Sequence, residues 1–378
     1  MKQKRESILR SNAFQALAAS LLCILLGLLI GYIVLLFINP TGAWKAITTV
    51  VKNFLYYPRP NKQLQYLGDT MVKTAPLLMC SLSILFAYKV GLFNIGAAGQ
   101  YVAGAGASLY CALAWHMPWW VCLIAAMAAG ALWGSLSGLL KAYCNVNEVI
   151  SCIMLNWIGL YLVNILLTNV KEVASPYTLE IAGYAPGSML PTLGLNTLFN
   201  NSKYVTIAIP LAVLMAVLVW VVLAKTKFGY ELRATGLNKF AARYCGMREK
   251  YNIVVTMAIA GALAGMGAAL LFLTGFERWS CTQSSVPGMG FNGIAAAFLG
   301  GLNPVGAIFS SYFIQHITSG GSYVDKTMYC AQISDLISAI IIYLCGFVLF
   351  LKQSMTGYAD RRDEKRAQKL HQEGGEAK

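Results

Sequence analysis

The chain has 378 residues, of which 57% are hydrophobic and only 12% are charged. A soluble globular domain carries about a quarter charged residues. This composition, with apolar runs of about 20 residues, excludes a soluble enzyme, a disordered protein and a fibrous protein. It predicts an all-α, polytopic membrane protein. The net charge of +14, from 29 basic and 15 acidic residues, indicates cytoplasmic loops rich in Lys and Arg. We therefore expect a lipid bilayer around the chain and no nucleic-acid partner.

The first segment, residues 1–16, is polar and basic, and we predict that it forms a cytoplasmic N-terminus. The apolar run that follows, over about 17–38, is longer than the h-region of a signal peptide, and no small-residue cleavage site comes after it. We therefore predict an uncleaved first span. An amphipathic helix at the membrane surface is predicted within residues 39–70. There, apolar residues recur near the helical period, namely Trp44, Ile47, Val51 and Phe54.

The rest of the chain contains further apolar runs separated by short polar segments. We predict spans over about 71–88, 95–114, 118–140, 149–168, 204–224, 251–274 and 333–351. Prolines and glycines indicate a surface loop at 169–203. The charged residues 352–378 indicate a disordered cytoplasmic tail. One transmembrane domain over 17–351 would hold about ten transmembrane or re-entrant helices.

The apolar segment 290–318 is broken at Gly300-Gly301-Leu302-Asn303-Pro304. Each half is too short to cross a hydrocarbon core of about 30 Å. A single crossing would also place the basic C-terminal tail outside the cell, against the positive-inside rule. We therefore predict a re-entrant hairpin with 300–304 at its tip, which leaves both termini in the cytoplasm.

The segment 225–250 is the most polar internal stretch and is strongly basic. Asn238 is suited to cap a short helix over 239–245, and Gly246 is suited to end it. Ala242 and its small neighbours would give this helix a face that packs closely against another protein. The alternative is a solvated basic loop beside anionic lipid, and composition alone favours neither.

Two glycine-rich segments are similar to each other: 91–100 reads GLFNIGAAGQ, and 290–301 reads GFNGIAAAFLGG. Paired segments of this kind in two halves of a transporter indicate a substrate path near the membrane midplane. The alternative, close helix packing by small residues, fits equally well. The residues that we predict to lie near a translocation path are Phe93, Asn94, Gln100, Asn156, Phe291 and Asn292.

A third pattern is the GxxxG-like spacing of Gly130, Gly134 and Gly138, which predicts a helix–helix face. Lys141 and Glu148 would pair at the cytoplasmic edge of the two neighbouring spans. Asn156 lies inside a span, so it is either a hydrogen-bonding link between helices or a substrate contact.

The sequence lacks several expected signatures of other classes. It contains no GxxxxGK[ST] motif for nucleotide phosphates, and its three histidines are too scattered to predict a metal site. Acids within the spans are few, whereas ion-coupled carriers usually need them. Two classes of membrane protein stay open as alternatives: a self-contained secondary transporter or channel for a small polar solute, and a membrane-embedded enzyme.

Several motifs in chain order resemble the permeases of ABC importers for simple sugars and nucleosides, the branched-chain amino acid/ribose type. These motifs are TAPLL at 74–78, GLFNIGAAGQ at 91–100, NEVI and MLN within 147–156, residues 231–246, and LGGLNP at 299–304. The 147–156 run is more similar to the nucleoside branch than to the ribose branch. Ala98 stands where the family motif usually has Glu, so any role of that acid is absent here.

The resemblance implies a permease subunit that takes up nucleosides or related simple sugars across a bacterial plasma membrane. It also implies three partners: a separate ATPase subunit, a second permease subunit of different sequence, and an extracytoplasmic substrate-binding lipoprotein. ATP and Mg would be bound by the ATPase, so we expect this chain to bind no cofactor and to catalyse no reaction itself. The residues implied in ATPase coupling are Glu231, Arg233, Asn238, Ala242, Arg243 and Gly246.

Overall fold

The computed structural model describes residues 12–325, 327–329 and part of the stretch 336–357. Most of the predicted last span and nearly all of the predicted tail lie outside the described residues. The described part is helical, with only isolated β-bridges such as Lys171–Thr178. The all-α prediction is therefore confirmed. The segment 169–203 is largely irregular, as expected, with only short helices such as α7 (Ile181–Tyr184) and α8 (Leu195–Leu198).

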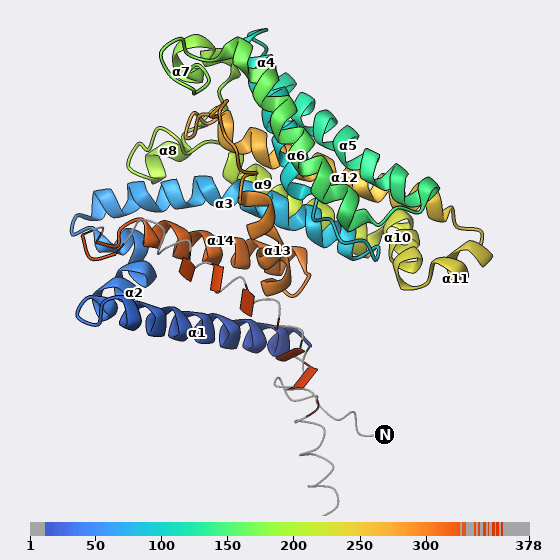
Figure 1. Ribbon diagram of the computed structural model, residues 1–378, viewed down its shortest axis with the longest axis horizontal. Coiled ribbons are helices and arrows are strands. Elements are labelled where there is room, and N and C mark those ends of the chain that lie inside the picture. Colours follow the sequence, from blue (N-terminus) through green and yellow to red (C-terminus); the bar gives the residue numbers. More distant parts are fainter. Residues whose placement is uncertain are drawn as a thin grey trace, which may run out of the picture.

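Six helices in the described part are long and apolar enough to cross a membrane. They are α1 (Asn12–Ile38), α3 (Pro60–Tyr88), α5 (Trp119–Cys144), α6 (Glu148–Leu167), α9 (Ala208–Lys225) and α12 (Glu249–Phe272). Helix α3 is the most buried of them, and Figure 1 shows it through the middle of the molecule. The shorter helix α4 (Ala97–Leu113) packs against α5, α6 and α12.

The molecule has two distinct ends along its long axis (Figure 1). One end holds α10 (Lys227–Leu237) and α11 (Lys239–Tyr244), and we call it the α10 end. The other holds α2 (Ala43–Lys52) and the short helix η2 (Asn53–Tyr56), and we call it the α2 end. Helix α1 leads to the α2 end, so the first described residues lie toward the α10 end (Figure 1).

Helices α5 and α12 pack backbone to backbone. A Cβ atom on Gly138 would lie 3.0 Å from Val254 Cα, and a Cβ on Gly130 would lie 3.0 Å from Gly265 Cα. The glycine spacing on α5 is therefore confirmed as a helix–helix face. Such close approach permits extensive van der Waals contact, which drives helix association in a membrane.

The broken segment forms two helices, α13 (Met289–Leu299) and α14 (Pro304–Gly321), joined by a tight turn. Gly301 and Leu302 have φ angles of 65° and 55°, and the Asn303 side chain accepts a hydrogen bond from Val305 N at 2.9 Å. The Phe298 ring on α13 packs edge-on against Tyr88, the last residue of α3, with ring centroids 5.3 Å apart. Helix α3 ends toward the α10 end (Figure 1), so the turn lies toward that end as well.

Helix α14 then returns to the α2 end, where Gly320 packs on the backbone of Val50. The predicted hairpin is therefore present in the structure. The side of the membrane on which each end lies stays a prediction.

Helix α2 has a buried face and an exposed face, and the apolar positions noted in its sequence fall on both. Ile47 is buried, whereas Trp44 is 69% exposed and Val51 is 47% exposed. The buried face also contains Ala46 and Val50, because these residues pack against α14. The position of α2 at the membrane surface stays a prediction. A period near 3.6 identified a helix, but only the position of α14 determines which side is covered.

Candidate functional site

Asn94 and Gln100 form a closed pair of amides beneath the first turn of α4. Asn94 Nδ2 donates to Gln100 Oε1 at 2.8 Å, and Gln100 Nε2 donates to Asn94 Oδ1 at 3.1 Å. Asn94 Nδ2 also donates to Ser83 Oγ on α3 at 3.0 Å. Both amides are fully buried. Their hydrogen-bonding groups are thus directed at each other, which joins α3 to α4.

Asn156 links α6 to the same segment. Its Oδ1 accepts from Gly99 N at 2.8 Å, and its Nδ2 donates to Ile95 O at 3.1 Å. A Cβ atom on Gly99 would lie 2.6 Å from Asn156 Oδ1, so only glycine allows this approach. In this structure Asn156 serves as the hydrogen-bonding link that the sequence left as one of two alternatives.

The two glycine-rich segments meet in space. A Cβ atom on Gly290, at the start of α13, would lie 2.5 Å from the backbone of Ala98. Phe291 is 39% exposed, while Phe93 and Asn292 are partly exposed. Of the six predicted path residues, the three buried amides support the fold around this junction. The two phenylalanines and Asn292 present surface beside it, and their place on a path stays a prediction.

The α10 end is built from two capped helices. Thr226 Oγ1 accepts from Gly229 N at 3.0 Å, which begins α10. Asn238 Oδ1 accepts from Phe240 N and Ala241 N, each at 3.0 Å, which begins α11. Gly246, with a φ angle of 79°, follows the end of α11. The predicted cap and stop are confirmed, but α10 itself was not predicted, because its sequence reads as a polar loop.

The outward surface of this end is apolar and aromatic rather than small. Leu237 is 89% exposed, Phe240 64% and Tyr244 94%. Ala242 is only 3% exposed. The prediction that Ala242 lies on an outward docking face is therefore wrong: Ala242 faces the chain itself, because α11 folds back on α10 and α12.

The charged residues predicted to couple an ATPase lie around this apolar surface. Arg233 and Arg243 are exposed, and Glu231 is half-buried. Arg243 lies 3.9 Å from Glu249, and Lys227 lies 3.9 Å from Glu231. Lone exposed ion pairs of this length contribute little to stability. These side chains are therefore available to a partner.

A backbone contact joins the α10 end to the buried amides. Gly236, near the end of α10, packs on the turn after α3: its Cβ atom would lie 2.5 Å from the carbonyl carbon of Val90. Gly91, with a φ angle of 76°, faces Gly236 in turn. Beside this contact, Asn252 Nδ2 donates to Thr235 Oγ1 at 2.9 Å in a buried position. A displacement of α10 would therefore reach the segment that holds Asn94.

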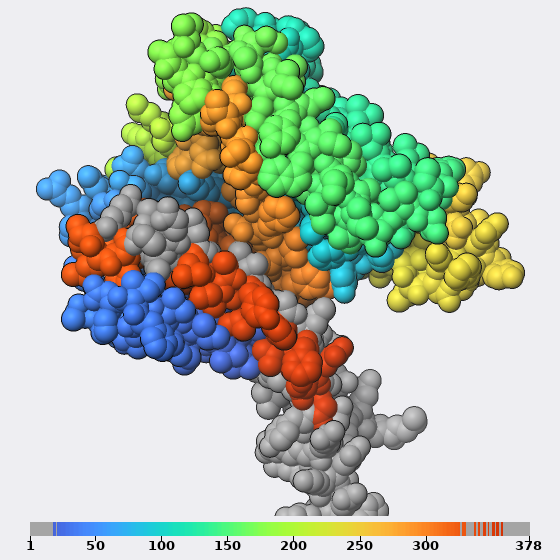
Figure 2. Space-filling view, viewed as in Figure 1, coloured from blue at the N-terminus to red at the C-terminus, as the bar shows by residue number. Residues whose placement is uncertain are grey.

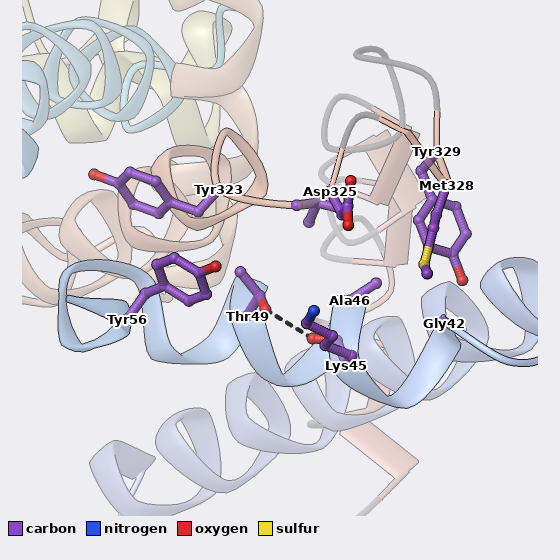
Figure 3. Close-up of a pocket in the computed structure, with 10 residues that line it drawn as sticks. Gly42, Lys45, Ala46, Thr49, Tyr56, Tyr323, Asp325, Met328 and Tyr329 are labelled. Atoms are coloured by element: carbon purple, nitrogen blue, oxygen red, sulfur yellow. Dashed lines mark hydrogen bonds between the residues drawn. The ribbon is translucent and has the colours of Figure 1, made fainter. Parts of the chain in front are cut away.

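The α2 end carries a polar hollow of about 250 Å³ (Figure 3). Lys45 and Thr49 line it from α2, and Tyr323 and Asp325 line it from the chain after α14. Hydrogen bonds from Thr327, together with Lys45, lower the pKa of Asp325. The carboxylate therefore stays charged at neutral pH.

A tyrosine cluster lies beside this hollow and contains Tyr56, Tyr57, Tyr66 and Tyr323. The rings of Tyr57 and Tyr66 stack with centroids 4.2 Å apart, and Tyr323 packs edge-on against both. Burial raises the pKa of Tyr57 to about 12, so its phenol is neutral at physiological pH. The cluster fixes the start of α3 to the end of α14.

Lys141 on α5 and Glu148 on α6 form the predicted ion pair, with Lys141 Nζ 2.8 Å from Glu148 Oε2. In the part of the chain that the structure describes, no group of three or more His, Cys, Asp or Glu side chains is placed to hold a metal ion.

Comparison with known proteins gives one family. A family model described as "Branched-chain amino acid transport system / permease component" matches residues 66–346. The guanosine ABC transporter permease protein NupP of Bacillus subtilis is 34% identical over 285 residues, which cover 74% of this chain and 80% of that protein. No solved structure matches the chain significantly.

Two further relatives differ in the solute that their names give. The nucleoside ABC transporter permease protein NupB of Lactococcus lactis is 28% identical over 343 residues, covering 88% of this chain and 91% of that protein. The glucose ABC transporter permease protein TsgB13 of Haloferax volcanii is 29% identical over 306 residues, covering 78% of this chain and 80% of that protein.

Proposed function

Because the chain belongs to the family of permease components of branched-chain amino acid transport systems, we propose that it takes up nucleosides as the pore-forming subunit of an ABC importer. The observation that carries the choice of solute is its similarity over most of its length to permeases named for guanosine and nucleosides. A relative named for glucose makes a simple sugar the alternative.

The proposed site of ATPase docking is the α10 end. Leu237, Phe240 and Tyr244 form an exposed apolar surface there, with basic residues around it. Aromatic residues are enriched at protein interfaces because they bury a large area with little loss of rotamer freedom. The contact between Gly236 and the turn at Val90 then gives ATPase closure a mechanical route into the membrane domain.

Docking of an ATPase would place the α10 end in the cytoplasm, and the rest of the proposed topology follows from that. The start of α1 lies toward the same end (Figure 1), so the N-terminus would be cytoplasmic. The α2 end, with its hollow and tyrosine cluster, would face outward, where a substrate-binding lipoprotein delivers solute. A second permease subunit of different sequence would complete the pore.

Uptake by the assembled importer tests the proposal. The gene is deleted in its own host, and uptake of labelled guanosine, uridine and glucose is measured with and without the restored gene. We expect the deletion to abolish saturable guanosine and uridine uptake and to leave glucose uptake unchanged. Loss of glucose uptake alone would assign the chain to sugars.

A second experiment tests the alternative that the chain is a secondary transporter. The purified chain is placed in liposomes without ATPase or binding protein and given a proton or sodium gradient. We expect no nucleoside accumulation. Accumulation under either gradient would identify a secondary carrier and contradict the proposal.

A further inference from the structure

Helix α2 packs beside an exposed apolar stripe on α1. Residues 39–42 alone connect the two helices, and the helices are in contact. In Figure 2 the N-terminal helices form a blue surface at one edge of the molecule. Apolar residues at every fourth position of α1 are 40–86% exposed, namely Leu21, Leu25, Leu29, Ile33 and Phe37. On a helix that spans a membrane, such a stripe is suited to face the hydrocarbon core.

The contact of Trp44 with α1 sets the depth of α2 along that helix. The Trp44 ring packs edge-on against Tyr32, with ring centroids 6.0 Å apart and ring planes inclined by 83°. Tyr32 lies about 9 Å before the end of α1 at Ile38, measured along the helix axis. Interfacial helices lie about 5–10 Å into the boundary between headgroups and acyl chains. The first turn of α2 is therefore level with this boundary when α1 spans the bilayer.

The exposed face of α2 has an apolar edge and a basic edge. An α-helix turns by about 100° per residue, so residues seven positions apart lie within about 20° of each other. Trp44 and Val51, 69% and 47% exposed, form the apolar edge. Lys45 and Lys52, both exposed, form the basic edge about 100° away. Tryptophan and lysine are typical of membrane interfaces, where the ring lies among acyl chains and the ammonium group among headgroups.

The charge around this face is positive. Residues 7–68 contain no acidic residue. Lys52 forms no ion pair with any residue that the structure describes, whereas Lys45 shares the hollow of Figure 3 with Asp325. Arg59, at the N-cap position of α3, is exposed as well. These cations exceed the acids near them, which favours ligands that carry a net negative charge.

We propose that the exposed face of α2 lies in the membrane interface and binds anionic phospholipid. Lys45 and Lys52 contact the phosphate groups, since each lysine near an anionic membrane surface is attracted to it. Trp44 and Val51 lie among the first carbons of the acyl chains. This binding requires only that α1 spans a membrane, whichever solute the chain transports.

The apolar edge favours lipid over a protein as the occupant of this face. Trp44 lies against α1, and the exposed stripe of α1 ends at Phe37, close to the start of α2. A soluble protein that bound Lys45 and Lys52 would leave Trp44 and the stripe uncovered. A phospholipid covers both edges at once, because its headgroup is charged and its chains are apolar.

Quenching of a fluorophore on α2 by spin-labelled lipids tests this binding. In the full-length chain freed of native cysteines, Thr48→Cys places the fluorophore between the two edges, where the native hydroxyl bonds to the backbone of its own helix. Phosphatidylcholine vesicles hold equal small fractions of nitroxide-labelled phosphatidylcholine or phosphatidylglycerol. We expect both lipids to quench, and phosphatidylglycerol to quench about threefold more strongly or better. Equal quenching by the two lipids, or no quenching by either, would overturn the proposal.

Removal of the two lysines separates headgroup binding from insertion. In Lys45→Gln/Lys52→Gln the two lipids should quench equally, while quenching by phosphatidylcholine persists because the apolar edge is intact. Lys239→Gln/Lys250→Gln is the matched control, since it removes the same charge from exposed positions on α11 and at the start of α12. The control should keep the preference for phosphatidylglycerol. A preference that survives in the first variant, or disappears in the control, would contradict the proposal.

The assembled importer gives the last readout. The labelled chain is combined with its partner subunits before reconstitution into the same vesicles. We expect the same preference for phosphatidylglycerol, because the exposed face of α2 stays against lipid. Loss of quenching on assembly would mean that a partner protein covers α2, and the proposal would then be wrong even if the importer transports nucleosides.

Discussion

The tyrosine cluster at the α2 end and the aromatic side chains of α11 at the α10 end differ in their surroundings. At the α2 end, Tyr57, Tyr66 and Tyr323 pack on one another, with the closest ring centroids 4.2 Å apart. At the α10 end, Phe240 and Tyr244 are 64% and 94% exposed. Rings that pack on one another stabilise the subunit, whereas exposed rings can contact another protein. The difference is what we expect if the proposed ATPase covers α11, whereas the tyrosine cluster already packs within the subunit.

The largest effect is expected from placing charge on the α10 end. The double variant Phe240→Asp/Tyr244→Asp would bury two carboxylates against the ATPase, and desolvation of unpaired charge is costly. We expect loss of ATPase co-purification and of transport, with normal insertion into the membrane. Tyr184→Asp is the control, because Tyr184 is 57% exposed on α7, away from the α10 end. Retained co-purification in the double variant would show that the ATPase docks elsewhere.

A smaller effect is expected from the buried amides between the ends. Asn94→Leu leaves the Gln100 amide unpaired, which should lower the free energy of unfolding by about 1–3 kcal/mol. The double variant Asn94→Leu/Gln100→Leu removes both partners and should recover part of that loss. Thermal unfolding of the purified protein measures both. Full stability of Asn94→Leu would mean that the pair contributes nothing to the fold.

At the α2 end, we expect a loss of stability without a loss of partner binding. Tyr66→Leu removes the stack on Tyr57, and such aromatic pairs contribute about 0.5–1.5 kcal/mol beyond their buried area. The melting temperature should fall by a few degrees while the ATPase still co-purifies. Tyr66→Phe keeps the ring and serves as the control. Loss of the ATPase from Tyr66→Leu would remove the distinction between the ends.

The smallest effect is expected at Lys141. Its ion pair with Glu148 is 2.8 Å long, but the Lys141 side chain is 30% exposed. Ion pairs near the surface contribute roughly 0–1 kcal/mol, so Lys141→Ala should change the melting temperature by no more than a few degrees and leave transport intact. A large loss of transport would instead give this pair a role in the transport cycle.

Much of the fold could be predicted because local physics determines it. Runs of apolar residues marked the spans, Asn238 and Gly246 marked the limits of α11, and the break at 300–304 marked the hairpin. Each of these signals lies within a few residues of the structure that it specifies.

Features that depend on contacts distant in sequence could not be predicted. The direction of Ala242 depends on how α11 folds against α12, and the link from Asn156 to Gly99 depends on how α6 packs against α4. A polar or aromatic residue in a span reads the same in sequence whether it faces a partner, a ligand or another helix.

We propose that α10 transmits ATPase closure to the membrane core through Gly236. The most direct measurement compares transport with ATP hydrolysis in the importer that carries Gly236→Ala, whose added Cβ would lie 2.5 Å from the Val90 carbonyl carbon. We expect the ATPase to co-purify and hydrolyse ATP at near the wild-type rate, because Leu237 and Phe240 are unchanged, while nucleoside uptake falls at least tenfold. Uptake at the wild-type rate would contradict the claim.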